Sequence, residues 1–307
     1  MKIDYQVHTT ASDGKFSPKE CVAMAKKNGV ESIAITDHDT VGGIEEAVLA
    51  GQEFGVEIIS GIEMSCEKGD WGIHMLGFGI DPQNALLQVQ LGEFRLGREA
   101  RAERAVLQLQ ELGFHVDFAD VRKRAAGVIA RPHIADEIME HPANAEKLAR
   151  EKITTRKDLF DAYLADEAKT PVFASHTRLT IERAINLIHN AGGVAVWSHP
   201  LVSIADFKLV GEALQQFILW GLDGIEVIGN FTEDDTEFLE GLAAKYKLLR
   251  SVGSDFHDTF VDPEKLEEGA AAIGGYKTYG YPIEGIRESV LATIKKRRTE
   301  VAPQVSF

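Results

Sequence analysis

The sequence predicts an α/β protein built on a parallel sheet or barrel, interrupted by a helical insertion. Short apolar stretches typical of buried strands alternate with segments that carry helix start and stop signals, and the links between them are short. Between residues 84 and 169 this alternation stops, and helix formers replace the β-branched runs. We therefore expect a discontinuous domain formed by residues 1–83 and 170–300, with residues 84–169 as the helical insertion.

Strands and helices alternate regularly in the first part of the chain. Ser17-Pro18 marks the start of a helix and Asn28-Gly29 its end, because proline suits the first helical position and glycine suits the helix C-terminus. The apolar run Ile33-Ala34-Ile35 predicts a strand that ends in Thr36-Asp37-His38-Asp39. The expected elements are strands at 2–7, 33–35, 57–63 and 71–80, and helices at 18–28 and 44–54.

The insertion contains a row of arginines at every third position. Residues three apart are neighbours on a helix surface, so two interpretations stay open. The row is either a solvated helix face that pairs with Glu93, Glu99 and Glu103, or a basic lining over a phosphate-bearing ligand. Its members are Arg95, Arg98, Arg101 and Arg104.

The insertion also holds residues 127–133, which read GVIARPH. Pro132 fits the first turn of a helix that runs to Met139. Arg131 and His133 would then lie at a helix N-terminus, where free N–H groups and the helix dipole favour anions. The alternative is that both are ordinary surface residues.

The alternation of strands and helices resumes after Thr170-Pro171. A strand at 194–197 is expected to end in Ser198-His199-Pro200, and a strand at 248–253 in Ser254-Asp255-Phe256-His257. The other expected elements are a strand at 224–228 and helices at 181–190, from Pro200 to Gly221, up to about Lys247, and at 283–297 after Pro282.

Composition excludes several classes of protein. The formal charge of −15 argues against a broad nucleic-acid surface, although a local phosphate pocket remains compatible with it. Cys21 and Cys66 are the only two cysteines, which suits a reducing compartment. No apolar run approaches the roughly 20 residues that span a bilayer, and no charged and apolar leader precedes the first strand. We expect a cytoplasmic protein without a membrane partner.

Imidazole and carboxylate side chains occur at the C-terminal ends of the predicted strands. In α/β proteins this edge of the sheet binds ligands. Mixed histidine and carboxylate ligation suits Mn, Fe or Zn better than Ca or Mg, and so many groups exceed the needs of one tetrahedral ion. Two or three metals are therefore expected. The candidate ligands are His8, Asp13, His38, Glu63, His74, His199, Asp255 and His257.

A resemblance to a known family runs in order from residue 3 to about residue 258. It is carried by the motifs DYQVHTTASDG, IAITDHD, SGIE, IHMLGFG, ARPHIA, AVWSHP and VGSDFH. Together these resemble the polymerase and histidinol phosphatase (PHP) domain family, and most closely its small bacterial nucleotide phosphatases and exoribonucleases. The resemblance implies a distorted (β/α)₇ barrel with a helical insertion, and a trinuclear metal centre that hydrolyses phosphoesters.

The resemblance also implies roles for single residues. The first metal would be held by His8, Glu63 and Asp255, the second by Asp13, His38 and His257, and the third by Glu63, His74 and His199. Arg131 and His133 would bind phosphate, and His176 would be a further substrate contact. Arg131 would neutralise charge on the phosphoryl oxygens, and His199 or His133 would protonate the leaving group.

One position departs from the family pattern. The family has His-x-His on the first strand, whereas this chain has Gln6-Val7-His8. A glutamine offers a carbonyl oxygen, which is a poorer ligand than imidazole for a borderline metal. The first metal is therefore expected to be weakly bound, exchangeable or absent.

Three functions remain in view at this point. The first is hydrolysis of nucleotides or short oligonucleotides by a metal-activated hydroxide, as in 3′,5′-bisphosphate nucleotidases or 5′–3′ exoribonucleases. The second is a histidinol-phosphate-type phosphatase. The third is a weakened PHP domain kept as a metal-binding or regulatory module, for which Gln6 is the motive. Arg131 and His133 in the insertion favour the first.

Overall fold

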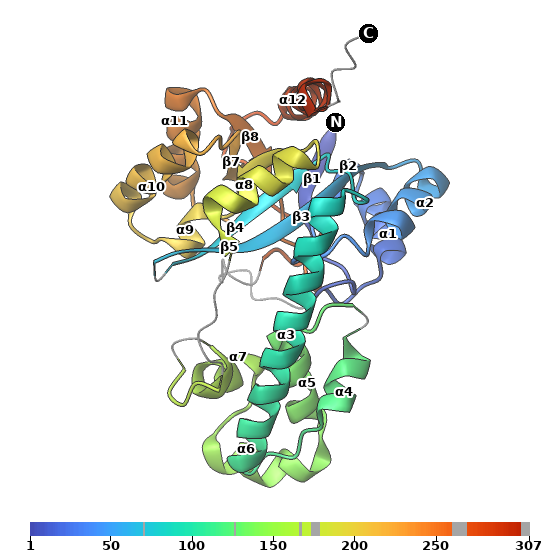
Figure 1. The fold of residues 1–307 in the computed structure, drawn as a ribbon, viewed down its shortest axis with the longest axis vertical. Helices are drawn as coiled ribbons and strands as arrows, with labels where there is room; N and C mark the ends of the chain where they lie inside the picture. The colour runs from blue at the N-terminus through green and yellow to red at the C-terminus, as the bar shows by residue number, and fades with distance from the viewer. Residues whose placement is uncertain (70, 126, 166–167, 173–178, 260–268, 302–307) are drawn as a thin grey trace.

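The protein, seen here as a computed structural model, is a mostly parallel sheet flanked by helices, with further helices projecting from one end (Figure 1). The structure describes residues 1–69, 71–125, 127–165, 168–172, 179–259 and 269–301. Within these residues the strand order of the sheet is β1-β2-β3-β4-β6-β7-β8, and the short β5 pairs with β3.

The first three strands are parallel and are joined by two helices, as the sequence predicts. The helix α1 begins with the expected cap, because the Ser17 side chain accepts the backbone N–H of Glu20 and Glu20 in turn accepts the backbone N–H of Ser17. The elements are β1 (Lys2–Val7), α1 (Pro18–Lys27), β2 (Val30–Ile35), α2 (Ile44–Phe54) and β3 (Glu57–Lys68).

The fourth strand, β4 (Trp71–Phe78), follows β3 directly and is antiparallel to it. The sequence predicts that β3 ends at Glu63, but the strand continues to Lys68 because it pairs with β4 over its whole second half. On its other side β4 is antiparallel to β6 (Val194–Trp197). The last strands, β7 (Gly224–Ile228) and β8 (Leu249–Val252), continue parallel to β6.

The two outer strands of this order are connected where they end. The backbone N–H of His8 donates to the carbonyl of Phe256 at 2.9 Å, and Val7 forms a parallel bridge with Phe256. This contact brings the residues that follow β8 next to those that follow β1. Side chains from both ends of the chain can therefore share one site.

The C-terminal part of the chain also contributes helices that pack against the sheet. The single helix expected from Pro200 to Gly221 is two helices, and the last helix begins at Ile286 because Gly285, with φ of 80°, ends the preceding turn. These elements are β5 (Leu179–Thr180), α8 (Ile181–Asn190), α9 (Pro200–Ser203), α10 (Phe207–Leu219), α11 (Glu233–Tyr246) and α12 (Ile286–Val301).

The remaining helices form a group at the end of the molecule opposite α12 (Figure 1). They pack around a hydrophobic cluster of their own that includes Leu109, Ile134 and Leu159, separate from the cluster at the sheet. The group comprises α3 (Ala85–Glu111), α4 (Phe118–Arg124), α5 (Arg131–Glu140), η1 (Pro142–Asn144), α6 (Ala145–Glu151), α7 (Arg156–Leu159) and η2 (Phe160–Leu164).

Two contacts fasten this helical group to the loop after β1. The backbone N–H of Val128 donates to the carbonyl of Ala11 at 3.0 Å, and Gly127 lies so close that a Cβ there would stand 2.0 Å from the Ala11 oxygen. Lys15 also forms an ion pair with Asp136 of α5 at 2.8 Å.

Among the described helices, none is long and apolar enough to span a membrane.

Candidate metal centre

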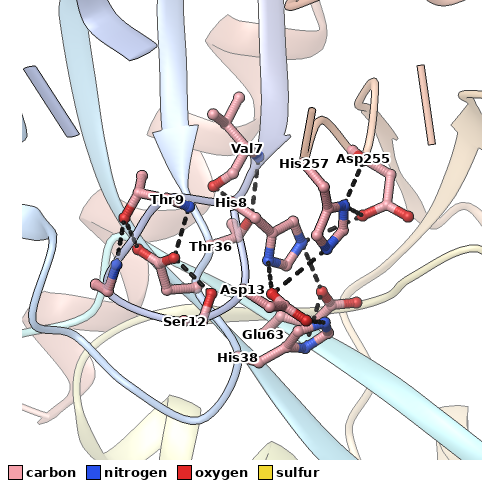
Figure 2. A network of polar contacts seen from close by, with 12 residues as sticks. Val7, His8, Thr9, Ser12, Asp13, Thr36, His38, Glu63, Asp255 and His257 are labelled. Atoms are coloured by element: carbon pink, nitrogen blue, oxygen red, sulfur yellow. Dashed lines mark hydrogen bonds and ion pairs between the residues drawn. The ribbon is translucent and has the colours of Figure 1, made fainter. Parts of the chain in front are cut away.

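The structure brings all eight candidate ligands to one edge of the sheet. They follow β1, β2, β6 and β8 or lie on β3 and β4, and Figure 2 shows six of them turned toward one another: His8, Asp13, His38, Glu63, Asp255 and His257. The other two, His74 of β4 and His199 just after β6, both contact Glu63.

Glu63 is the centre of this cluster. Its Oε2 lies 3.0 Å from His8 Nε2 and 3.4 Å from His38 Nδ1. Its Oε1 lies 3.2 Å from His74 Nδ1 and 3.1 Å from His199 Nε2. Because the side chain is completely buried, both carboxylate oxygens are committed to the four imidazoles rather than to solvent.

Asp13 and Asp255 extend the cluster on the side of His257. Asp255 Oδ1 lies 3.2 Å from His8 Nε2, and Asp13 Oδ1 lies 3.5 Å from His257 Nε2. Within the described residues, three groups have ligand atoms close enough to hold a metal ion. They are His8, Asp13, His38 and His257; His38, Glu63 and His74; and His8, Glu63 and Asp255.

These groups overlap with the sets that the family resemblance implies. The group of His8, Glu63 and Asp255 is identical to the implied first set. The second group contains the implied ligands Asp13, His38 and His257 and adds His8. The third group contains Glu63 and His74 as implied, but it has His38 where the resemblance implies His199; His199 Nε2 nevertheless lies 3.2 Å from His74 Nδ1.

The donor atoms fit a divalent transition metal. Buried polar atoms normally have hydrogen-bond partners, yet at this edge imidazole nitrogens and carboxylate oxygens face each other at short range without one. Lone pairs of nitrogen and oxygen that converge in this way suit Mn, Fe or Zn. The buried atoms without a hydrogen bond to a described residue include both ring nitrogens of His8, Asp13 Oδ1, His38 Nδ1, Glu63 Oε2, His199 Nδ1 and Asp255 Oδ1.

The protonation states of the side chains in the cluster favour the binding of cations. Burial lowers the pKa of His38 to about 4, so its ring is neutral at pH 7 and has a free lone pair. Burial alone would raise the pKa of Glu63, but the His38 and His74 rings hold it well below its usual range, so the carboxylate is ionised. Glu63 outweighs the effect of burial on His199 and raises the pKa of that ring to about 9, so a metal binding there would displace a proton.

Asp37 holds the loop that carries Asp13. Its Oδ1 accepts the backbone N–H of Thr9 at 2.7 Å and the hydroxyl of Ser12 at 2.6 Å, and its Oδ2 accepts the Thr9 hydroxyl at 2.8 Å. Asp37 is buried beside His38, so its role is to fix the loop against the tip of β2. This first carboxyl of the IAITDHDT stretch therefore orients neighbouring residues and belongs to none of the three ligand groups.

Gln6 takes the place of the family's first histidine and contacts the same centre. Its amide nitrogen donates to Ser198 Oγ at 2.8 Å and to Glu63 Oε1 at 3.3 Å, whereas its buried carbonyl oxygen has no partner among the described residues. In this orientation the amide stabilises the Glu63 carboxylate through its N–H group and not through its potential ligand atom, the oxygen.

Sequence reasoning missed Glu226 of β7. This carboxyl is buried, and its Oε2 accepts the backbone N–H of His199 at 2.8 Å. Burial raises the pKa of Glu226 well above its usual range. The only signal in the sequence is its place near the end of a buried strand, which does not reveal a bond to a backbone group of another strand.

A cavity of about 1210 Å³ opens beside the ligand cluster, between the sheet edge and the helical group. Its lining includes Asp13, His38 and His74 on the sheet side and Arg131 at the start of α5. The neighbouring His133 accepts the backbone N–H of Ala130 at its Nδ1, at 3.0 Å. His176, expected as a further substrate contact, lies outside the described residues.

The fold and this cluster define an α/β protein with a histidine and carboxylate cluster at the edge of its sheet that could hold metal ions. The model of the PHP domain matches residues 4–165, and the chain belongs to the PHP domain family. The sequence resemblance to this family is therefore confirmed.

Individual relatives cover most of the chain. A 5′–3′ exoribonuclease from Haemophilus influenzae is 34% identical over 83% of this chain and 90% of its own length. A 3′,5′-nucleoside bisphosphate phosphatase from Chromobacterium violaceum is 31% identical over 83% of this chain and 87% of its own length. A solved structure from Bifidobacterium adolescentis, described as a metal-dependent phosphoesterase, superposes with a TM-score of 0.77 at 29% identity, covering 95% of this chain and 96% of that one.

Proposed function

We propose that the protein hydrolyses phosphate esters of nucleotides or short oligonucleotides with the help of divalent transition metals. The observation that carries this proposal is the convergence of eight histidine and carboxylate side chains, three of which, Asp13, His38 and His74, line a cavity that Arg131 also borders. The names of the relatives support the reaction and the class of substrate. The protein is thus a metal-dependent phosphoric ester hydrolase.

The proposed ligand sets follow the family pattern. His8, Glu63 and Asp255 would hold one ion, Asp13, His38 and His257 a second, and Glu63, His74 and His199 a third. When bound, such ions polarise a phosphoryl group and supply hydroxide near neutral pH. We also propose that the sheet closes as a distorted (β/α)₇ barrel with residues 84–169 as an insertion domain, which the contact between Val7 and Phe256 supports.

Arg131 and His133 would bind the reacting phosphate. A guanidinium offers a planar pair of donors that matches phosphate oxygens. His133 uses Nδ1 as an acceptor, so its neutral ring carries the proton on Nε2 and can donate it in a hydrogen bond. Burial lowers the pKa of His133, which favours this neutral donor over an imidazolium acid. His199 is committed to Glu63 and His74, which favours a ligand role over protonation of the leaving group.

Gln6 supports one rival function, that of a weakened PHP domain kept as a metal-binding or regulatory module. Its amide presents hydrogens rather than a lone pair to Glu63. Such a module would bind metal but turn over no substrate. Turnover of a generic aryl phosphate by the metal-loaded protein separates this rival from the proposed enzyme.

The decisive experiment is a substrate screen with added Mn²⁺. Nucleoside monophosphates, nucleoside bisphosphates, histidinol phosphate and short 5′-phosphorylated RNAs would be compared by phosphate or nucleotide release. The proposal expects the highest kcat/KM on a nucleotide or short RNA. Preference for histidinol phosphate would support the second family activity, and no turnover of any compound would support the module.

A further inference from the structure

Arg98 of α3 connects the helical group to the sheet edge. Its Nε donates to Asp39 Oδ2 at 3.1 Å, and its Nη2 contacts the same oxygen and donates to Ser65 Oγ at 3.1 Å. Asp39 Oδ1 in turn accepts the backbone N–H of Ser65 at 2.8 Å. These contacts join α3, the residues after β2 and the second half of β3, and we call Arg98, Asp39 and Ser65 the clamp.

The clamp lies next to all three members of one candidate metal-ligand group. Asp39 follows His38 in the chain, and its backbone N–H donates to the carbonyl of Glu63 at 2.9 Å. Ser65 lies directly opposite His74 in the antiparallel pair of β3 and β4. His38, Glu63 and His74 are one of the three groups that could hold an ion. A shift of the clamp would therefore move the ligands of this group relative to one another.

The residues after β2 are held beside β3 by few bonds. The strand β2 ends at Ile35, and beyond it His38 forms an isolated bridge with Glu63. Asp39 has φ of 53°, a region that L-residues other than glycine seldom occupy. Such a backbone persists when its surroundings fix it. Here the Asp39 carboxylate supplies this fixation through its bond to Ser65.

The ion pair of the clamp lies in the interior of the protein. The Asp39 side chain is only 2% exposed, and that of Arg98 is 17% exposed. Removing one member of such a pair leaves the other as an uncompensated buried charge, which is strongly destabilising. The position of Asp39 therefore depends on Arg98, and through it on the place of α3.

We propose that Arg98 and Asp39 are positioning residues for the metal site of His38, Glu63 and His74, so that the helical group controls how tightly this site binds its ion. The inference rests on the proposed metal centre, but it does not depend on which phosphate ester is hydrolysed. The other two ligand groups both contain His8, which follows β1 and has no contact with the clamp among the described residues, so they are expected to respond less.

The first test is a Mn²⁺ titration of the chelator-treated full chain, in which the free ion is counted by its electron paramagnetic resonance signal. Arg98→Met is expected to weaken one Mn²⁺ site by about 10-fold or more and the others by less than about 3-fold, as loss of a group that orients ligands does. Arg98→Lys should restore part of the affinity, since it returns the charge without the paired donors. Arg95→Met, at an exposed position of the same helix, should match the wild type.

A second substitution tests whether Arg98 acts through Asp39. Asp39→Asn removes the charge that Arg98→Met leaves unpaired, so the double variant should melt later than Arg98→Met and bind Mn²⁺ no more weakly. It also covers the case in which the single methionine variant does not fold. Losses in Mn²⁺ affinity that simply add would overturn the coupling. Unchanged Mn²⁺ affinity with a raised KM would show that Arg98 contacts the substrate instead, and would also overturn the proposal.

Hydrogen exchange in the metal-free protein gives a readout that needs neither ion nor substrate. The backbone N–H of Ser65, which Asp39 accepts, should exchange faster in Arg98→Met than in wild type or Arg95→Met, while residues 57–60 of β3 exchange alike in all three. Equal exchange at Ser65 with equal Mn²⁺ affinity would overturn the positioning role. A wild type that binds Mn²⁺ as expected but hydrolyses no phosphate ester would overturn only the proposed function.

Discussion

At the scale of single residues, Arg131 tests whether the helical group takes part in the reaction. It stands at the first position of α5 and borders the cavity, but it is not a metal ligand type. Arg131→Ala is expected to leave metal content unchanged and to lower kcat/KM on a phosphorylated substrate by on the order of 10²-fold. Arg131→Lys should recover part of this loss, since it restores the charge without the paired donors.

The same variant shows which phosphate Arg131 binds when it is assayed on nucleoside monophosphates and bisphosphates. If Arg131 binds the reacting phosphate, Arg131→Ala should lose equally in kcat/KM on both. Unaltered kinetics on the best substrate would remove α5 from the active site and leave specificity to the sheet edge alone.

Gln6 stands where the family resemblance implies a histidine. Gln6→His is expected to raise metal occupancy and the rate at limiting Mn²⁺, because an imidazole supplies a lone pair where the amide now presents hydrogens to Glu63. Metal content would be measured by elemental analysis after dialysis, beside the rate. Gln6→Leu is the control that removes the amide without adding a ligand. If histidine changes neither quantity, the site does not need a second imidazole.

Glu226 is expected to hold His199 in place. His199 has φ of 27° and precedes Pro200, a combination that L-residues rarely adopt, and its N–H donates to the Glu226 carboxyl. Glu226→Leu should therefore release this backbone and weaken metal retention by about 10-fold or more, as loss of a group that orients a ligand does. Glu226→Gln keeps an acceptor of the same size and should restore most of it.

The outcome for Glu226 is read from metal affinity together with the thermal midpoint. If Glu226→Leu melts earlier but binds Mn²⁺ as tightly as wild type, the carboxyl stabilises the strand and does not position His199. Glu240→Leu on α11 is a comparison that removes a carboxyl from a neighbouring element without touching the metal centre.

At the scale of secondary structure, the elements that the sequence predicts best are those with local start and stop signals. Ser17-Pro18 fixes the start of α1 because the capping bonds involve residues only three apart. The antiparallel pairing of β4 and the extension of β3 to Lys68 were not predictable in this way, since they depend on partners brought together by the fold. Glu226 escaped notice for the same reason.

The sequence shows the row of arginines on α3 but not the direction in which each side chain points. Each step of three residues turns a helix about 60° short of a full circle, so four such residues spread over roughly half of the helix surface. They cannot all face one way. Arg98 and Arg101 border the cavity, whereas Arg95 and Arg104 are exposed, so the row is divided between the two faces, and its binding of a phosphate-bearing ligand stays a prediction.

The contact of Gly127 with the loop after β1 can be tested by a single substitution. Gly127 leaves no room for a side chain, because a Cβ would meet the Ala11 carbonyl at 2.0 Å. Gly127→Ala is expected to push this loop apart, to shift Asp13 and Arg131 relative to each other, and to lower kcat/KM by about 10-fold or more, as small misplacements of catalytic groups do.

The control for this variant is Gly113→Ala, a glycine of the same helical group at which an added Cβ meets nothing within 4 Å. That variant tests the cost of backbone strain alone, since Gly113 has φ of 87°. If Gly127→Ala retains full kcat/KM, the close approach to Ala11 does not position the two halves of the site.

At the scale of the whole molecule, the protein concentrates opposite charges in adjacent places. A chain with a formal charge of −15 buries Glu63 among imidazoles and lines the neighbouring cavity with arginines. The overall negative charge therefore does not oppose binding of an anionic substrate, because screening limits the reach of surface charges to about 8–10 Å at physiological salt. The charges close to the site, rather than the net charge of the chain, decide which ligands bind there.

The metal centre couples this local arrangement to the stability of the whole fold. Its ligands follow β1, β2, β6 and β8 or lie on β3 and β4, so ions bound there would join segments from both ends of the chain. A ligand that binds only the folded state stabilises it by about 2.7 kcal/mol when present at 100 times its dissociation constant. We therefore expect at least two transition ions per chain after purification without chelator, and a thermal midpoint that rises with Mn²⁺ and falls on chelation.

Glu63→Gln provides the sharpest form of this prediction, because Glu63 contacts four of the five clustered imidazoles and takes part in two of the three ligand groups. The substitution keeps the shape of the side chain but removes its negative charge, so it should lower the number of bound ions and abolish most of the Mn²⁺-dependent rise in thermal midpoint. Glu53→Gln, at an exposed position of α2, should preserve both. Wild-type protein without bound metal, whose thermal midpoint does not respond to Mn²⁺, would contradict a metal centre here and with it the proposed hydrolysis.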